Sequence, residues 1–133
     1  MKMKIKQHYI KTILMGILLS NPLLAMDVAT YYDVDIKSMQ ISVESSKKVL
    51  LLLQSGATLE EQYTVINETQ EKLRKLFASV DSTPSKHVGY YMKHQKEVKD
   101  FYENNATLQD QYAQLEAKLE NINKTVQTIR EAK

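Results

Sequence analysis

The chain has 133 residues, enough for one small domain, and carries a formal net charge of +2. It contains no cysteine, which excludes a disulfide framework and thiol chemistry. Its three glycines, Gly16, Gly56 and Gly89, are too few for a glycine-rich phosphate-binding loop.

Residues 1–25 have the order of parts that is typical of a secretory signal peptide. Four lysines open the segment, Ile13–Leu19 is apolar, and Ala25 is a small residue at a plausible cleavage point. The apolar run is shorter than the roughly 20 residues of a membrane span, so an uncleaved inner-membrane anchor is only the alternative. Removal of the segment leaves 14 basic and 16 acidic residues, a net charge of −2, and takes away the support for nucleic-acid binding. We therefore predict a periplasmic or secreted protein.

Residues 26–34 show no hydrophobic period and are predicted to be an irregular lead-in to a helical domain over 35–133. Asp35 is a candidate N-cap, and Gly56 follows a helix C-terminus. The first predicted helix thus covers about 35–55. Its apolar residues recur every three or four positions: Ile36, Met39, Val43, Leu50 and Leu53.

The second predicted helix covers about 59–80 and has the clearest start signal in the chain. Thr58 is followed three residues later by Glu61, which is the capping-box arrangement. The register of the first helix, continued past Gly56, meets mostly polar residues, so a turn or a sharp bend is expected there. The predicted apolar seam of the second helix consists of Leu59, Tyr63, Ile66, Leu73, Phe77 and Val80, with Gln70 as its polar member.

The third predicted helix runs unbroken from about 85 to 131. Thr83 is its candidate N-cap and Pro84 its first residue. Asn105 falls within its seam, where a buried asparagine commonly fixes register or oligomeric state. A spacing of 3.5 residues is sustained over more than five heptads by Tyr91, His94, Val98, Phe101, Asn105, Leu108, Tyr112, Leu115, Leu119, Ile122, Val126 and Ile129.

These helices predict an all-α fold with a long C-terminal, coiled-coil-like helix. A tight turn at Gly56 gives a three-helix bundle, which we favour, and a mere kink gives a long helical hairpin. In the bundle, the end of the third helix overhangs and needs a second copy or another protein to cover it, so a dimer or higher oligomer is expected. The predicted interaction seam consists of Asn105, Leu108, Tyr112, Leu115, Leu119, Ile122, Val126 and Ile129.

Positive charge is concentrated between residues 72 and 99, a segment that contains seven lysine and arginine residues and only two acidic residues. Folding near residues 81–84 brings both sides of this segment together at one tip of the molecule. The ordinary interpretation is a solvated helix face. The sharper hypothesis is that this basic tip meets an anionic envelope surface. Its members are Lys72, Arg74, Lys75, Lys86, Lys93, Lys96 and Lys99.

No motif indicates a catalytic residue, a cofactor or a small-molecule substrate. His87 and His94 are two helical turns apart, about 10 Å, and His94 with Glu97 lacks a third ligand, so no metal is predicted. We predict a non-enzymatic structural or interaction protein that acts by coiled-coil association in the cell envelope. In broad architecture it is similar to accessory subunits of secretion or conjugation machinery, an analogy at the level of fold alone. The alternative is a periplasmic holdase-like or surface-binding protein that uses the apolar overhang or the basic tip.

Overall fold

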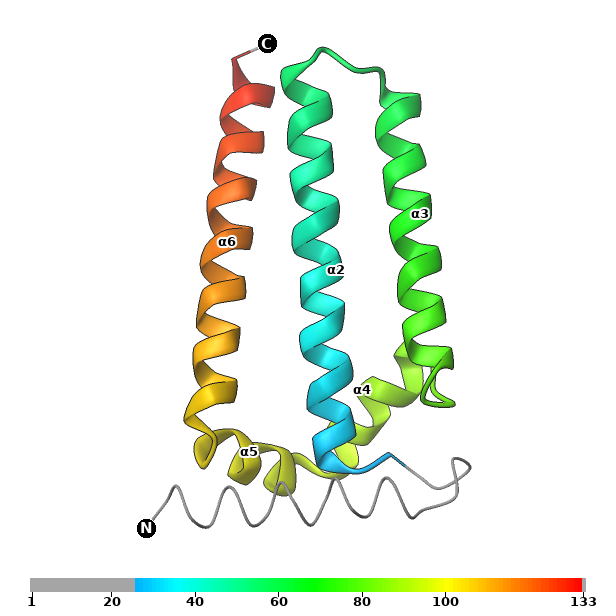
Figure 1. The fold of residues 1–133 in the computed structure, drawn as a ribbon, viewed down its shortest axis with the longest axis vertical. Coiled ribbons are helices and arrows are strands. Elements are labelled where there is room, and N and C mark those ends of the chain that lie inside the picture. The colour runs from blue at the N-terminus through cyan, green and yellow to red at the C-terminus, as the bar shows by residue number, and fades with distance from the viewer. Residues whose placement is uncertain (1–25, 133) are drawn as a thin grey trace.

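The computed structural model describes residues 26–132, which form five helices and no strand. The all-α prediction is therefore confirmed. The predicted signal peptide, residues 1–25, lies outside the described residues. With the labels of Figure 1, the helices are α2 (Val28–Gln54), α3 (Leu59–Ala78), α4 (Pro84–Lys93), α5 (Gln95–Glu103) and α6 (Ala106–Glu131).

The three long helices lie side by side in one layer, with α2 in the middle (Figure 1). Helix α3 runs antiparallel to α2, and α6 runs parallel to it. The short helices α4 and α5 cross from the end of α3 to the start of α6 at the end of the layer where α2 begins, which we call the base. Since α3 and α6 pack on α2 rather than on each other, α2 is the helix on which the fold is built.

Helix α2 begins seven residues earlier than predicted. The side chain of Asp27 accepts a hydrogen bond from the backbone N–H of Thr30 at 2.8 Å and is the true N-cap. Val28, Tyr31 and Tyr32 are buried, and their spacing already follows the helical period that Ile36 continues. The prediction of an irregular lead-in over 26–34, with Asp35 as the N-cap, is therefore wrong.

The connection between α2 and α3 is a tight turn, as the bundle prediction requires. Gly56 has a φ of +74°, its N–H donates to Leu53 O at 3.2 Å, and the N–H of Ala57 donates to Leu52 O at 2.8 Å. This pair of bonds is a Schellman motif, which ends a helix at a left-handed residue. Thr58 and Glu61 then form the predicted capping box, with both reciprocal hydrogen bonds present. Helix α3 consequently starts afresh and returns along α2.

The predicted third helix is not continuous. Thr83 caps α4 and Pro84 is its first residue, as predicted, but α4 ends at Lys93, and His94 separates it from α5. The chain bends again at Asn104 and Asn105, where the Asn105 side chain accepts from the N–H of Leu108 at 3.0 Å and caps α6.

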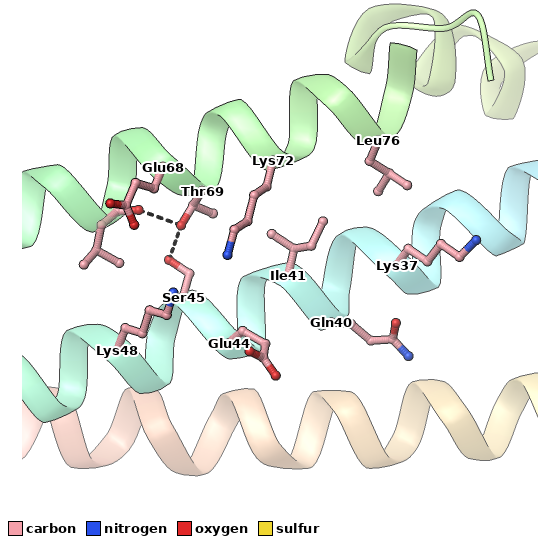
Figure 2. Close-up of a pocket in the computed structure, with 11 residues that line it drawn as sticks. Lys37, Gln40, Ile41, Glu44, Ser45, Lys48, Glu68, Thr69, Lys72 and Leu76 are labelled. Carbon is pink, nitrogen blue, oxygen red and sulfur yellow. Dashed lines mark hydrogen bonds between the residues drawn. The ribbon is translucent and has the colours of Figure 1, made fainter. Parts of the chain in front are cut away.

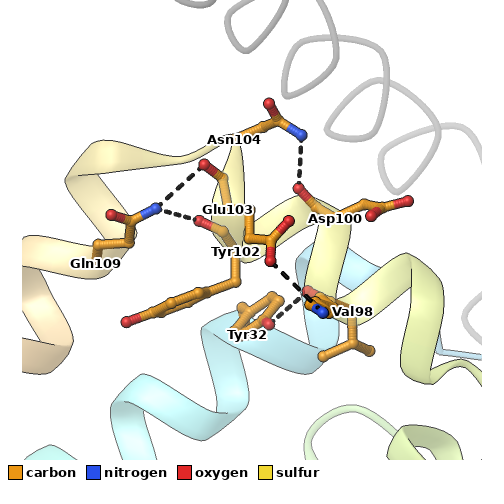
Figure 3. Close-up of polar contacts among 8 residues, drawn as sticks. Tyr32, Val98, Asp100, Tyr102, Glu103, Asn104 and Gln109 are labelled. Atoms are coloured by element: carbon orange, nitrogen blue, oxygen red, sulfur yellow. Dashed lines mark hydrogen bonds and ion pairs between the residues drawn. The ribbon is translucent and has the colours of Figure 1, made fainter.

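Figure 3 shows how this second bend is stabilised. The Gln109 side chain, from the first turn of α6, donates to the backbone carbonyls of Tyr102 at 2.7 Å and Glu103 at 3.2 Å. The Asn104 side chain donates to the carbonyl of Asp100 at 2.8 Å. The carbonyls of Asp100 and Tyr102 also accept the backbone N–H groups of Asn104 and Asn105, at 3.1 Å each, so the side chains add second hydrogen bonds to them at the end of α5. The bend therefore leaves few backbone carbonyls without a hydrogen-bond partner.

Because of the two bends, α6 begins at the base and runs along α2 over its length. Its stripe packs against the matching stripe of α2 in the main apolar core, so the predicted overhang is wrong. Each large aliphatic side chain buried in this way gains about 1.5–3 kcal/mol, which outweighs the few helical hydrogen bonds lost at the bends. The buried members of this core are Val28, Tyr31, Tyr32, Ile36, Val43, Val98, Leu108, Leu115 and Ile122.

Candidate functional site

A cluster of hydrogen-bonded side chains at the base joins three helices through one carboxylate. Asp35 of α2 lies 3.1 Å from Nε2 of His87 in α4, measured to Oδ1, and its Oδ2 accepts a hydrogen bond from the hydroxyl of Tyr112 in α6. His87 is 6% exposed and stacks on Tyr31, with ring centroids 4.2 Å apart. The hydroxyl of Tyr32 donates to the carbonyl of Val98 in α5 at 2.6 Å (Figure 3). We call Tyr31, Tyr32, Asp35, His87 and Tyr112 the base cluster.

The base cluster shifts the acidity of its own members. Burial raises the pKa of the Asp35 carboxyl, but the hydrogen bonds from His87 and Tyr112 together lower it by more, so its pKa lies below the ordinary 3.8. Burial raises the pKa of Tyr31 to about 12, with the charge of Asp35 adding to the effect. Burial also raises the pKa of Tyr32 and, with the hydrogen bond to Asp35, that of Tyr112. The cluster is therefore arranged to hold Asp35 ionised and the tyrosines neutral.

This arrangement ties helices together through hydrogen bonds. Within the described residues, Asp35 is the one side chain that hydrogen-bonds the His87 ring, and Nδ1 of that ring is buried without a partner. The position of Asp35 among the apolar residues of an amphipathic helix could have indicated this cluster. The sequence prediction instead makes Asp35 the N-cap of the first helix. We interpret the base cluster as the set of contacts that fixes the positions of α4 and α6 relative to α2.

A groove of about 390 Å³ lies between α2 and α3 on one face of the layer (Figure 2). Ser45 and Thr69 are hydrogen-bonded across it at 2.6 Å. Its charged lining mixes signs, so no single ligand charge is favoured. The lining residues are Lys37, Gln40, Ile41, Glu44, Ser45, Lys48, Val65, Glu68, Thr69, Lys72 and Leu76.

An apolar stripe of α3, next to the stripe that packs on α2, is largely uncovered over the first half of the helix. Leu59 is 69% exposed, Tyr63 60% and Ile66 40%, and their spacing of four and three places them on one side of the helix. The side that meets α2 carries Gln62, which is buried, and Thr69, which bonds Ser45. We call Leu59, Tyr63 and Ile66 the α3 edge.

The predicted seam of the second helix is therefore correct only near its end. Phe77 is buried and Leu73 and Val80 are half-buried, whereas the predicted members at the start of α3 are exposed. The reason is that α3 touches α2 through the neighbouring stripe, which contains Gln62, Val65, Thr69 and Leu76. The more apolar stripe, which periodicity selects, lies beside this contact and is exposed over the first half of α3.

The predicted interaction seam of the third helix lies inside the chain. Asn105 is the N-cap of α6 and not a seam residue, because its side chain bonds the backbone. The other members face α2: Leu108, Leu115 and Ile122 are buried, Tyr112, Leu119 and Val126 pack partly buried against the same core, and Ile129 is half-buried.

The predicted basic tip is spread over the second half of α3 and over α4 and α5. Arg74 pairs with Glu71 at 2.6 Å and Lys99 with Glu103 at 3.8 Å, and Lys72 lines the groove. The exposed residues Lys75, Lys86, Lys93 and Lys96 have no ion pair within residues 26–132. Exposed apolar side chains, Val88 at 60% and Met92 at 62%, lie on α4 beside them.

No group of three or more histidine, aspartate or glutamate side chains within residues 26–132 is arranged to hold a metal ion. None of the helices in this part of the chain is long and apolar enough to cross a membrane. Comparisons of the chain with protein-family models, with curated proteins and with solved structures found no match.

Proposed function

We propose that the protein is an exported, non-enzymatic interaction protein of the cell envelope that acts by helix-to-helix association. The observation that carries this proposal is the α3 edge, where two large side chains on one stripe, Leu59 and Tyr63, are more than half exposed, whereas the facing stripes of α2 and α6 cover each other. Leaving such side chains in water forfeits about 1.5–3 kcal/mol for each, so a packing partner is favoured. Export is supported by the signal-peptide pattern of residues 1–25.

The α3 edge replaces the α6 seam as the surface of association. An exposed apolar stripe that lies beside a helix–helix contact can accept a further helix from outside. A role as an accessory subunit of a larger envelope assembly agrees with such an edge. The holdase-like or surface-binding alternative loses one of its two features, the apolar overhang, because the α6 seam packs on α2, and it keeps the basic tip.

A photo-crosslinking amino acid placed at Tyr63 in producing cells tests the proposal. We expect a covalent adduct with a protein, and we expect the adduct in the envelope or secreted fraction. The matched control carries the same amino acid at Gln40, an exposed residue of the mixed-charge groove on α2. Adducts at neither position, or equal adducts at both, would contradict association through the α3 edge.

A second candidate function is binding to an anionic surface through the base. It is favoured by the exposed apolar residues Val88 and Met92 next to the unpaired Lys93 and Lys96. Vesicles that contain anionic lipid should sediment the protein at low salt and lose it at physiological salt. Lys93→Glu with Lys96→Glu should abolish this binding, while a reversal of the exposed Lys47 on α2 should not. Binding to neutral vesicles of equal strength would argue against it.

A further inference from the structure

We infer that the partner of the α3 edge is a second copy of this chain, paired antiparallel through α3. This inference rests on the proposed function, because it names the occupant of the same surface. The first observation is that charge is divided along α3. Glu60 and Glu61 stand in its first turn, and Arg74 and Lys75 stand near its end. One end of the helix is therefore acidic and the other is basic.

An antiparallel pair of identical helices places unlike ends together. A two-fold axis near Ile66, in the middle of the stripe, sets Glu60 of one copy close to Arg74 of the other, and symmetry repeats this contact at the opposite end. Both residues lie on the outward flank of the stripe, as the helical period requires. In a parallel pair, like charges would face each other at both ends. The charge pattern thus favours a second copy in one orientation.

The stripe itself matches the same arrangement. Tyr63 of one copy meets Gln70 of its partner, and Ile66 meets its own counterpart at the axis, while the helix dipoles oppose one another. Helix α3 is about 30 Å long, and the apolar surface that it offers is small. We therefore expect a weak dimer, with a dissociation constant on the order of 10 µM.

Glu60 and Arg74 are free to make this contact. Glu60 has no ion pair within residues 26–132. Arg74 makes two hydrogen bonds to Glu71 of its own helix, at 2.6 and 2.9 Å. Because both side chains are at least half exposed, water weakens this pair, and the guanidinium has further N–H donors for a second carboxylate. Neither residue contributes to the core, so charge reversal at either leaves the monomer folded.

A charge-swap experiment on the purified protein tests the pairing. In sedimentation equilibrium, wild type should fit a monomer–dimer equilibrium. Glu60→Arg alone and Arg74→Glu alone should each weaken the dimer at least tenfold, since each places like charges together at both ends. The double variant should recover the dimer to within about threefold of wild type. Glu68→Arg, a reversal on the groove side of the same helix, is the matched control and should leave the dimer unchanged.

Circular dichroism melting of each variant confirms that the monomer stays folded. A wild-type protein that remains monomeric at 200 µM, about twenty times the expected dissociation constant, would overturn the inference. A dimer whose strength ignores the Glu60 and Arg74 reversals, or that the double variant does not recover, would overturn it as well. If Tyr63 then crosslinks only to a different protein, the proposed function stands and the self-pairing alone fails.

Discussion

Replacement of Asp35 by alanine should be the most costly single change of a polar residue in this protein. Asp35 accepts hydrogen bonds from His87 in α4 and Tyr112 in α6, so its loss frees both helices from α2 at the base. A hydrogen bond to a charged group contributes about 1.5–3 kcal/mol. Because the Asp35 side chain is 33% exposed, the lower end applies, and two such bonds give a loss of about 3 kcal/mol.

Urea denaturation, followed by far-UV circular dichroism at neutral pH, measures this loss. Asp33→Ala is the matched control: Asp33 lies on the exposed side of the same helix and pairs only with Lys37, so its loss should cost less than about 0.5 kcal/mol. A double-mutant cycle between Asp35→Asn and Tyr112→Phe should give a coupling of about 1 kcal/mol. The reasoning fails if the Asp35 and Asp33 variants are equally stable, or if the cycle shows no coupling.

The same carboxylate predicts an acid dependence. Its pKa is lower in the folded protein than the ordinary 3.8, so its contribution to stability is fully present above that value. The contribution is lost as the pH falls below 3.8 and through the lowered pKa. Asp35→Asn removes the titrating group, so the variant should lose less stability than wild type across this acid range. An identical acid profile for both proteins would contradict the role given to Asp35.

Three further outcomes are expected. The tyrosines of the base cluster have folded-state pKa values above the ordinary 10, about 12 for Tyr31. Their contribution to the free energy of unfolding is therefore full below pH 10 and is lost as the pH rises through the folded values. Alkaline titration followed by circular dichroism should show unfolding in that range and not at about pH 9. Asn105→Ala removes the N-cap of α6 and should cost about 1 kcal/mol in urea, whereas Asn123→Ala on the exposed side of α6 should cost almost nothing. Leu115→Asp with Ile122→Asp places two charges in the core, so circular dichroism should show the described domain unfolded. A folded monomer would instead support the prediction that this stripe of α6 is not covered within the chain.

The sequence alone determined that the domain is helical and where its main turn lies, but not the start of α2 or the two breaks after α4 and α5. The capping box of Thr58 and Glu61, the turn at Gly56 and the start at Pro84 are local signals, because each is satisfied by backbone groups within a few residues. The buried side of α6 could also be predicted, because a spacing of 3.5 residues identifies the apolar side of a helix wherever its partner lies. These features hold whatever the rest of the chain does.

Tertiary structure decided what covers each stripe. Asn105 fits a seam position and an N-cap equally well by sequence, and the burial of Leu115 and Ile122 on α2 favours the cap because it lets α6 turn back along its own chain. The hydrogen bonds of Asp35 likewise depend on His87 and Tyr112, which lie 52 and 77 positions away along the chain. Hydrophobic periodicity within one helix gives no information about contacts at such separations. The exposure of the α3 edge has the same origin. Helix α3 packs on α2 through the stripe that contains Gln62 and Thr69, so the neighbouring, more apolar stripe stays exposed.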